Sequence, residues 1–99
     1  MYTRVQATQA LGSDCHLPGS FQCPLIASLY GGTYVNGVRA SIVAAGDQAS
    51  RSIVVGALLG AAHGAAGVSQ EWRAKVVKVA EVEALVDELL KQRFELLDA

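Results

Sequence analysis

The sequence predicts an all-α protein. No stretch of its 99 residues alternates β-branched and polar residues over the length of a strand. Apolar residues recur instead at intervals of three and four, which is the spacing of one face of a helix. Glycines and N-capping residues separate these periodic stretches, so the chain should form several short helices joined by tight turns.

The first two helices are expected before residue 31. Residues 2–11 show a weak helical pattern that needs neighbouring elements to persist, and residues 12–14 end it. Pro18 suits the first turn of a second helix. Pro24 lies inside that helix, so we expect a late start or a kink there. The predicted buried stripe of this helix consists of Phe21, Leu25, Ile26 and Leu29.

Two further helices meet at a glycine-aspartate pair. Thr33 is a plausible N-cap for a helix from Tyr34 to about Ala45. Gly46 closes that helix, and Asp47 opens the next one as its N-cap. The predicted core face of the helix after Thr33 consists of Val35, Val38, Ile42 and Ala45.

The helix from residue 48 to residue 63 is apolar on every side, which predicts burial all round. Gly56, Gly60 and Gly64 recur at every fourth position. A row without side chains lets another helix backbone come close, and such a contact would offset the cost of glycine in a helix.

The remaining chain contains a loop at residues 64–67, a short helix after Ser69 and a last helix at about residues 79–97. The last helix has the pattern of an amphipathic surface helix. We expect residues 1–99 to form a single helical domain. The stripe on the last helix consists of Val82, Leu85, Val86, Leu89, Arg93 and Leu96.

Composition excludes several classes of protein. The net charge is −1 and no lysine and arginine cluster is present, so nucleic acid is not an expected partner. The longest apolar stretch, residues 53–68, contains His63 and is too short for a membrane span, and no signal peptide pattern begins the chain. Cys15 and Cys23 lack the spacing of a zinc site, and reduced thiols in a cytoplasmic protein are favoured over a bridge between them.

Asp47 is the most informative polar residue. A carboxylate between two apolar helices needs a cap, a partner or a metal, and the bare sequence favours the cap. Ser50 would lie on the same side of the first turn and could share a ligand with Asp47. Arg51 could neutralise a nearby carboxylate or reach solvent.

The two histidines are weaker candidates for a functional role. His63 suits a cation at the end of a helix better than a metal ligand. His16 lies near Asp14, Cys15 and Ser20, which invites a nucleophile hypothesis, but nothing in the sequence orients these residues as a triad.

The segment from Ala45 to Gly64, followed by residues 68–72, resembles the last conserved block of the ADP-ribosylglycohydrolases. That block contains a glycine-glycine-aspartate turn, a helix of the form G-A-L-x-G-A-x-x-G and a loop that reaches a tryptophan, here Trp72. Residues 18–21 and the helix after Thr33 resemble the segment before this turn. The resemblance covers about residues 14–80 and rests on a spaced combination of motifs.

The resemblance implies a partial ADP-ribosylglycohydrolase-like helical bundle. Members of the family cleave the glycosidic bond between ADP-ribose and a protein side chain, with a pair of magnesium ions held by an early T-D-D motif and a late G-D-x-D-T motif. Asp47 matches the first aspartate of the late motif and Ser50 matches its threonine, so these two residues are the expected metal ligands. Ala49 stands where the second aspartate belongs, and a lost carboxylate weakens a dinuclear site.

Two functional classes follow from this comparison. The pattern Gly-Asp-x-x-x-Arg resembles a divergent branch of the family that includes the J-type crystallins. In the first class, the chain is a carboxy-terminal fragment of a magnesium-dependent hydrolase, inactive and without magnesium on its own until an N-terminal half is supplied. In the second, it is a non-catalytic helical module that self-associates as a homo-oligomer, because its apolar helix at residues 53–62 needs cover.

Overall fold

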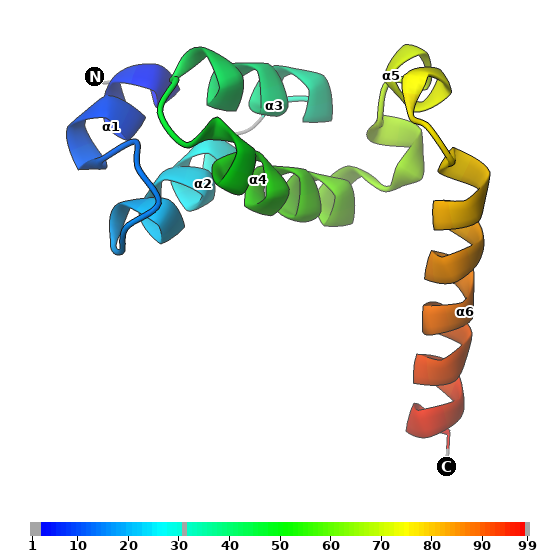
Figure 1. Ribbon diagram of the computed structural model, residues 1–99. Coiled ribbons are helices and arrows are strands. Elements are labelled where there is room, and N and C mark those ends of the chain that lie inside the picture. Colours follow the sequence, from blue (N-terminus) through cyan, green and yellow to red (C-terminus); the bar gives the residue numbers. More distant parts are fainter. Residues whose placement is uncertain (1–2, 31, 99) are drawn as a thin grey trace. The chain divides into compact units, whose positions relative to one another are not determined.

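The computed structural model describes residues 3–30 and 32–98. These residues form six α-helices and one 3-10 turn, without a strand, which confirms the all-α class (Figure 1). The chain divides into two compact units, Met1–Ser69 and Gln70–Ala99. The expectation of a single domain stays a prediction.

The first unit begins with helix α1 (Arg4–Leu11). Thr3 Oγ1 accepts a hydrogen bond from the Gln6 backbone N–H at 3.2 Å, and Gln6 Oε1 accepts one from the Thr3 N–H at 2.9 Å. This reciprocal capping box satisfies two N–H groups that the first turn leaves without helical partners. The cap therefore supports a helix whose apolar pattern is weak.

Helix α2 (Gly19–Leu29) begins directly after Pro18, so the alternative of a late start is wrong. Pro24 lies inside the helix and is buried, although it has no N–H to donate to the preceding turn. The predicted stripe was also wrong in part, because Phe21 and Leu29 are exposed. The buried face consists of small residues, namely Gly19, Cys23, Pro24 and Ala27.

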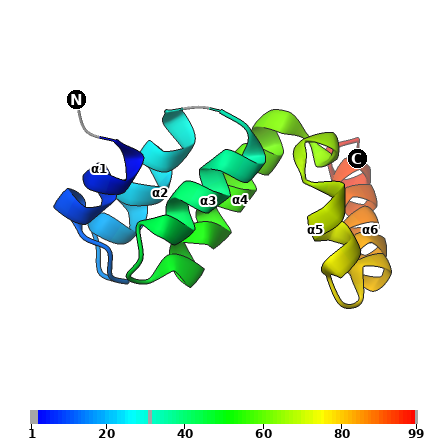
Figure 2. The same ribbon diagram turned by 90° about the horizontal axis from the view of Figure 1, so that it is seen from above.

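Helices α3 (Tyr34–Val43) and α4 (Gln48–His63) lie side by side (Figure 2). The core of the unit is formed by Ala27, Val55 and Leu59, with Tyr34 and Val38 packed against them. At Gly37 of α3, an added Cβ would lie 2.2 Å from Leu59 Cδ1 of α4. A glycine of α3 therefore permits this packing.

Helix α4 is not buried all round, which corrects the sequence prediction. Its buried residues are Arg51, Val55 and Leu59, while Ile53 on another face is 74% exposed. The glycine row does not meet a helix backbone either. An added Cβ would meet the hydroxyl of Tyr34 at Gly56 and the ring of Tyr34 at Gly60. At Gly64 an added Cβ would meet no described atom within 4 Å. One face of α4 holds the core together and the others remain uncovered.

After the 3-10 turn (Ala65–Gly67), the second unit contains α5 (Gln70–Lys75) and α6 (Val79–Leu97). An ion pair between Arg73 and Glu83 connects the two helices. Within the described part of the chain, no helix combines the length and apolar character needed to span a bilayer.

Candidate functional site

The turn between α3 and α4 carries the residues that the sequence singled out. Helix α3 ends at Val43, two residues earlier than expected, because Ala45 and Gly46 both adopt positive φ values of 60° and 66°. Two successive left-handed residues cannot continue an α-helix and reverse the chain. Gly46 is also tightly enclosed, since an added Cβ would lie 2.1 Å from the carbonyl oxygen of Ser13.

Asp47 follows this turn as the N-cap of α4, as the sequence predicted. Its Oδ1 accepts a hydrogen bond from the Ser50 backbone N–H at 3.3 Å. Its own backbone N–H donates to the carbonyl oxygen of Ser13. The carboxylate is half-buried and Ser50 is exposed, so the turn presents both residues at its outer side.

The contact between Ser13 and the turn was not visible in the sequence. The loop between α1 and α2 passes beside Gly46 and accepts the Asp47 N–H through Ser13. This backbone contact joins segments more than thirty residues apart along the chain, and no side-chain pattern announces it. The position of Asp47 therefore depends on the first loop as well as on its own helix.

Arg51 fixes the other side of the turn, in neither of the two roles that the sequence suggested. The side chain is only 3% exposed. Its Nη2 donates to the carbonyl oxygen of Ser41 at 2.8 Å and also to that of Ala45, while Nε donates to Ser41 Oγ at 3.2 Å. A cation that binds the last carbonyls of a helix is favoured by the helix dipole. Arg51 thus ties the end of α3 to the first turn of α4.

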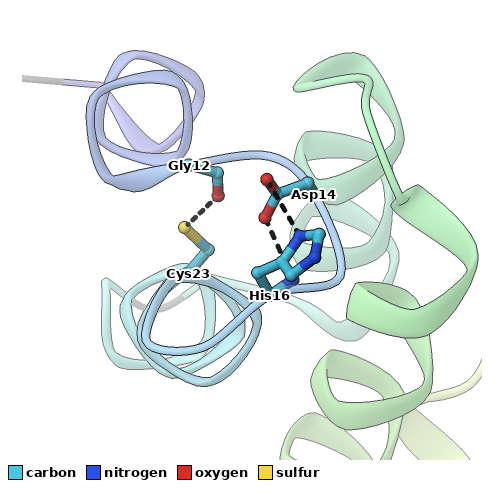
Figure 3. A network of polar contacts seen from close by, with 4 residues as sticks. All are labelled: Gly12, Asp14, His16 and Cys23. Carbon is cyan, nitrogen blue, oxygen red and sulfur yellow. Dashed lines mark hydrogen bonds and ion pairs between the residues drawn. The ribbon is translucent and has the colours of Figure 1, made fainter.

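Further buried polar groups surround Arg51. Ser41 Oγ and Ser52 Oγ lie 3.1 Å apart. Cys23 Sγ lies 3.2 Å from the carbonyl oxygen of Gly12 (Figure 3) and 3.6 Å from that of Thr8. Burial raises the pKa of the Cys23 thiol, and the charge of Arg51 opposes this shift. Cys23 therefore serves as a protonated donor that fastens α2 to the end of α1.

Cys15 and Cys23 are both free, in agreement with the expected reduced thiols. Cys15 is exposed on the first loop, whereas Cys23 is buried on α2. A bridge between them is absent from the structure.

His16 and Asp14 form a surface pair. His16 Nδ1 lies 3.4 Å from Asp14 Oδ2, and the His16 backbone N–H donates to Asp14 Oδ1 at 3.0 Å (Figure 3). This backbone hydrogen bond is the main reason that the pKa of the Asp14 carboxyl is lowered. Ser20 contributes only its backbone N–H, which donates to the His16 carbonyl oxygen. These contacts form a turn and provide no activated nucleophile.

His63 lies in the last turn of α4, where a cation suits the helix dipole. The side chain of His63 is exposed, and the next residue, Gly64, is the C-cap of the helix. This placement agrees with the helix-end role expected from the sequence.

Magnesium requires a set of oxygen ligands with near-octahedral geometry, usually including one or two carboxylates. The turn offers Asp47 and Ser50, while Ala49 contributes no ligand. Among the described residues, no group of three or more histidine, cysteine, aspartate or glutamate side chains gathers in a metal-binding arrangement. The donor set of this chain alone therefore does not make up a magnesium site.

Comparison with known proteins agrees with the features of the turn. The profile of the ADP-ribosylglycohydrolase family matches residues 2–97. Crystallin J1A from Tripedalia cystophora is 31% identical over 85 residues, which cover 86% of this chain and 26% of the relative. No solved structure matches. The chain spans about a quarter of the length of this curated relative, and it belongs to the ADP-ribosylglycohydrolase family.

Proposed function

We propose that this chain is the carboxy-terminal segment of a larger ADP-ribosylglycohydrolase-like protein and supplies Asp47 and Ser50 to its magnesium site. The reaction of such a protein is the hydrolysis of ADP-ribose from modified protein side chains. The observation that carries the proposal is the placement of Asp47. Ser13 and Arg51 hold the turn on two sides, and the side-chain cap uses Oδ1, so Oδ2 is the oxygen suited to a cation.

The segment is incomplete as a catalyst on its own. Two oxygen ligands do not hold a pair of magnesium ions, and the described residues add no cluster that could complete the set. The uncovered faces of α4 expose Ile53 and Leu58 to solvent. Apolar residues in such positions favour cover by further chain. We therefore propose that an N-terminal half supplies both the remaining ligands and this cover.

An assay of ADP-ribose release tests this proposal. The full 99-residue chain is incubated with an ADP-ribosylated protein and excess magnesium, and free ADP-ribose is measured against time. We expect no release above that of the matched variant Asp47→Asn, which removes the charge and retains the side-chain volume. Release that depends on magnesium and disappears in Asp47→Asn would show that the chain is a complete enzyme.

A second candidate function is a non-catalytic, self-associating helical module. Ala49 favours it, because the second carboxylate of the late metal motif is missing. The relative also carries the name of a crystallin, a description that applies to that protein. The cytoplasmic location predicted from the sequence stays a prediction under both candidates.

The genomic sequence before the codon for Met1 discriminates the two candidates. An open reading frame that encodes an early T-D-D motif supports the hydrolase segment, because it would supply the missing carboxylates. A frame without that motif supports the non-catalytic module.

A further inference from the structure

Helix α6 exposes a broad apolar face. Its eight large apolar residues after Val79 are 46–78% exposed. The described contacts with α5 involve the beginning of the helix, through the pair Arg73 and Glu83. Most of the stability of a helix in a protein comes from the packing of its apolar face, so this face needs a cover. The eight residues are Val82, Leu85, Val86, Leu89, Leu90, Phe94, Leu96 and Leu97.

The centre of this face follows the heptad spacing of a helix that pairs with another helix. Intervals of three and four residues recur along one seam, as in a coiled coil. Arg93 is exposed and occupies one position of the seam, so a partner that covers the apolar residues would cover its charge as well. A covered cation needs a carboxylate or other acceptors nearby. The seam consists of Val79, Val82, Val86, Leu89, Arg93 and Leu96.

We propose that α6 pairs in antiparallel orientation with α6 of a second copy of this chain. In a pair centred between Asp87 and Glu88, each helix lays the turn that contains Arg93 against the turn of the other helix that contains Glu83. Arg93 then lies opposite Val82 of the second copy, beside Glu83 of the same copy. The remaining layers place Val79 opposite Leu96 and Val86 opposite Leu89.

Charge selects this orientation. In a parallel pair, Arg93 of one copy would face Arg93 of the other inside the seam. Two like charges would then lie close together, and both would be removed from water. In the antiparallel pair, Arg93 extends a network that already contains Arg73 and Glu83 within each copy. The twofold symmetry of the pair forms this network twice.

Charge also selects the occupant. The exposed apolar residues of α4 are an alternative cover, but helix Gln48–His63 contains no acidic residue that could neutralise Arg93. Helix α6 itself provides the matching acid at Glu83. A second copy therefore satisfies both the apolar face and the charge within it. This proposal does not depend on the proposed hydrolase function.

Sedimentation velocity of the full chain over a range of concentrations tests the pairing. We expect a reversible monomer–dimer equilibrium with a dissociation constant on the order of 10 µM, since a single helix pair is a small interface. A chain that stays monomeric well above this concentration overturns the proposal, including the case in which α6 folds onto its own chain.

Charge reversals identify the surface and the orientation. The variant Arg93→Glu places two acids beside each other at both ends of the seam, and we expect the dissociation constant to rise about tenfold or more. Lys91→Glu makes the same charge change on the opposite face of α6 and serves as the matched control, with little expected effect. Equal effects of the two variants overturn the proposal, because association then uses another surface.

The double variant Glu83→Arg with Arg93→Glu exchanges the two charges and should restore most of the dimer. Mixing Arg93→Glu with the unmodified chain distinguishes the orientations. In a parallel pair, Arg93 of the unmodified chain would face the glutamate of the variant, so the mixed dimer would be strongly preferred. A strong preference for the mixed dimer overturns the antiparallel pairing. Circular dichroism confirms that each variant remains helical.

Discussion

Replacing Gly46 with alanine is expected to destabilise the first unit by about 3 kcal/mol. A Cβ at this position would lie 2.1 Å from the Ser13 carbonyl oxygen, which belongs to the backbone and cannot rotate away. The residue also has a φ of 66°, which a residue with a Cβ adopts at a cost of about 1 kcal/mol. The loss is measured by urea unfolding followed with far-ultraviolet circular dichroism.

The neighbouring residue provides the matched control. Ala45 already holds a Cβ at a φ of 60°. Replacing Ala45 with glycine therefore measures the conformational cost alone, as a gain of about 1 kcal/mol. A loss in Gly46→Ala that is no larger than the gain in Ala45→Gly would mean that the Ser13 loop does not pack against the turn.

Replacing Arg51 with methionine is expected to lower the free energy of unfolding by about 3 kcal/mol. Methionine fills much of the space but leaves the carbonyl oxygens of Ser41 and Ala45 without their shared donor. The last turn of α3 then loses the cation that its dipole favours. Urea unfolding measures the change, and hydrogen exchange at residues 44–47 reports whether the turn itself opens.

The variant Arg51→Lys separates charge from geometry. Lysine keeps a positive charge near the end of α3 but lacks the planar fork that serves two oxygens together. We expect it to recover only part of the stability that methionine loses. Equal stability of the methionine variant and the unmodified chain would show that Arg51 does not hold the turn.

The N-caps of α3 and α4 were the part of the fold most accessible from sequence. Thr33 and Asp47 both act as the expected N-caps, because each accepts a hydrogen bond from the backbone N–H three residues later. Such capping is local, so the residues within one turn determine it. The family resemblance read from the motif around Gly46 and Asp47 is likewise confirmed.

The packing was less accessible, because it depends on contacts between distant segments. The spaced glycines of α4 suggested a close helix contact, yet the glycine that packs tightly against a side chain of α4 is Gly37 of α3, a single glycine with no repeating pattern. The all-round apolar character of α4 suggested complete burial. Burial depends on what surrounds a helix, and the other helices of the first unit cover only one face of α4.

The candidate site was predictable in part. The cap at Asp47 followed from sequence, whereas its support from the Ser13 carbonyl did not. The sequence alone suggests that Arg51 pairs with a carboxylate or reaches solvent, since an arginine is seldom buried with only neutral oxygens as partners. The position of Arg51 just after the end of α3 indicates its observed role, because the last carbonyl oxygens of that helix need hydrogen-bond donors. The metal role of Asp47 and Ser50 stays a prediction.

Magnesium titration of the full chain, followed through the backbone amide signals of Asp47 and Ser50, tests the central claim most directly. The account predicts that these signals show no saturable shift with a dissociation constant tighter than about 1 mM, because the chain alone offers too few oxygen ligands. A saturable site tighter than this value that is lost in Asp47→Asn would contradict the account, because the turn would then bind magnesium without a further segment.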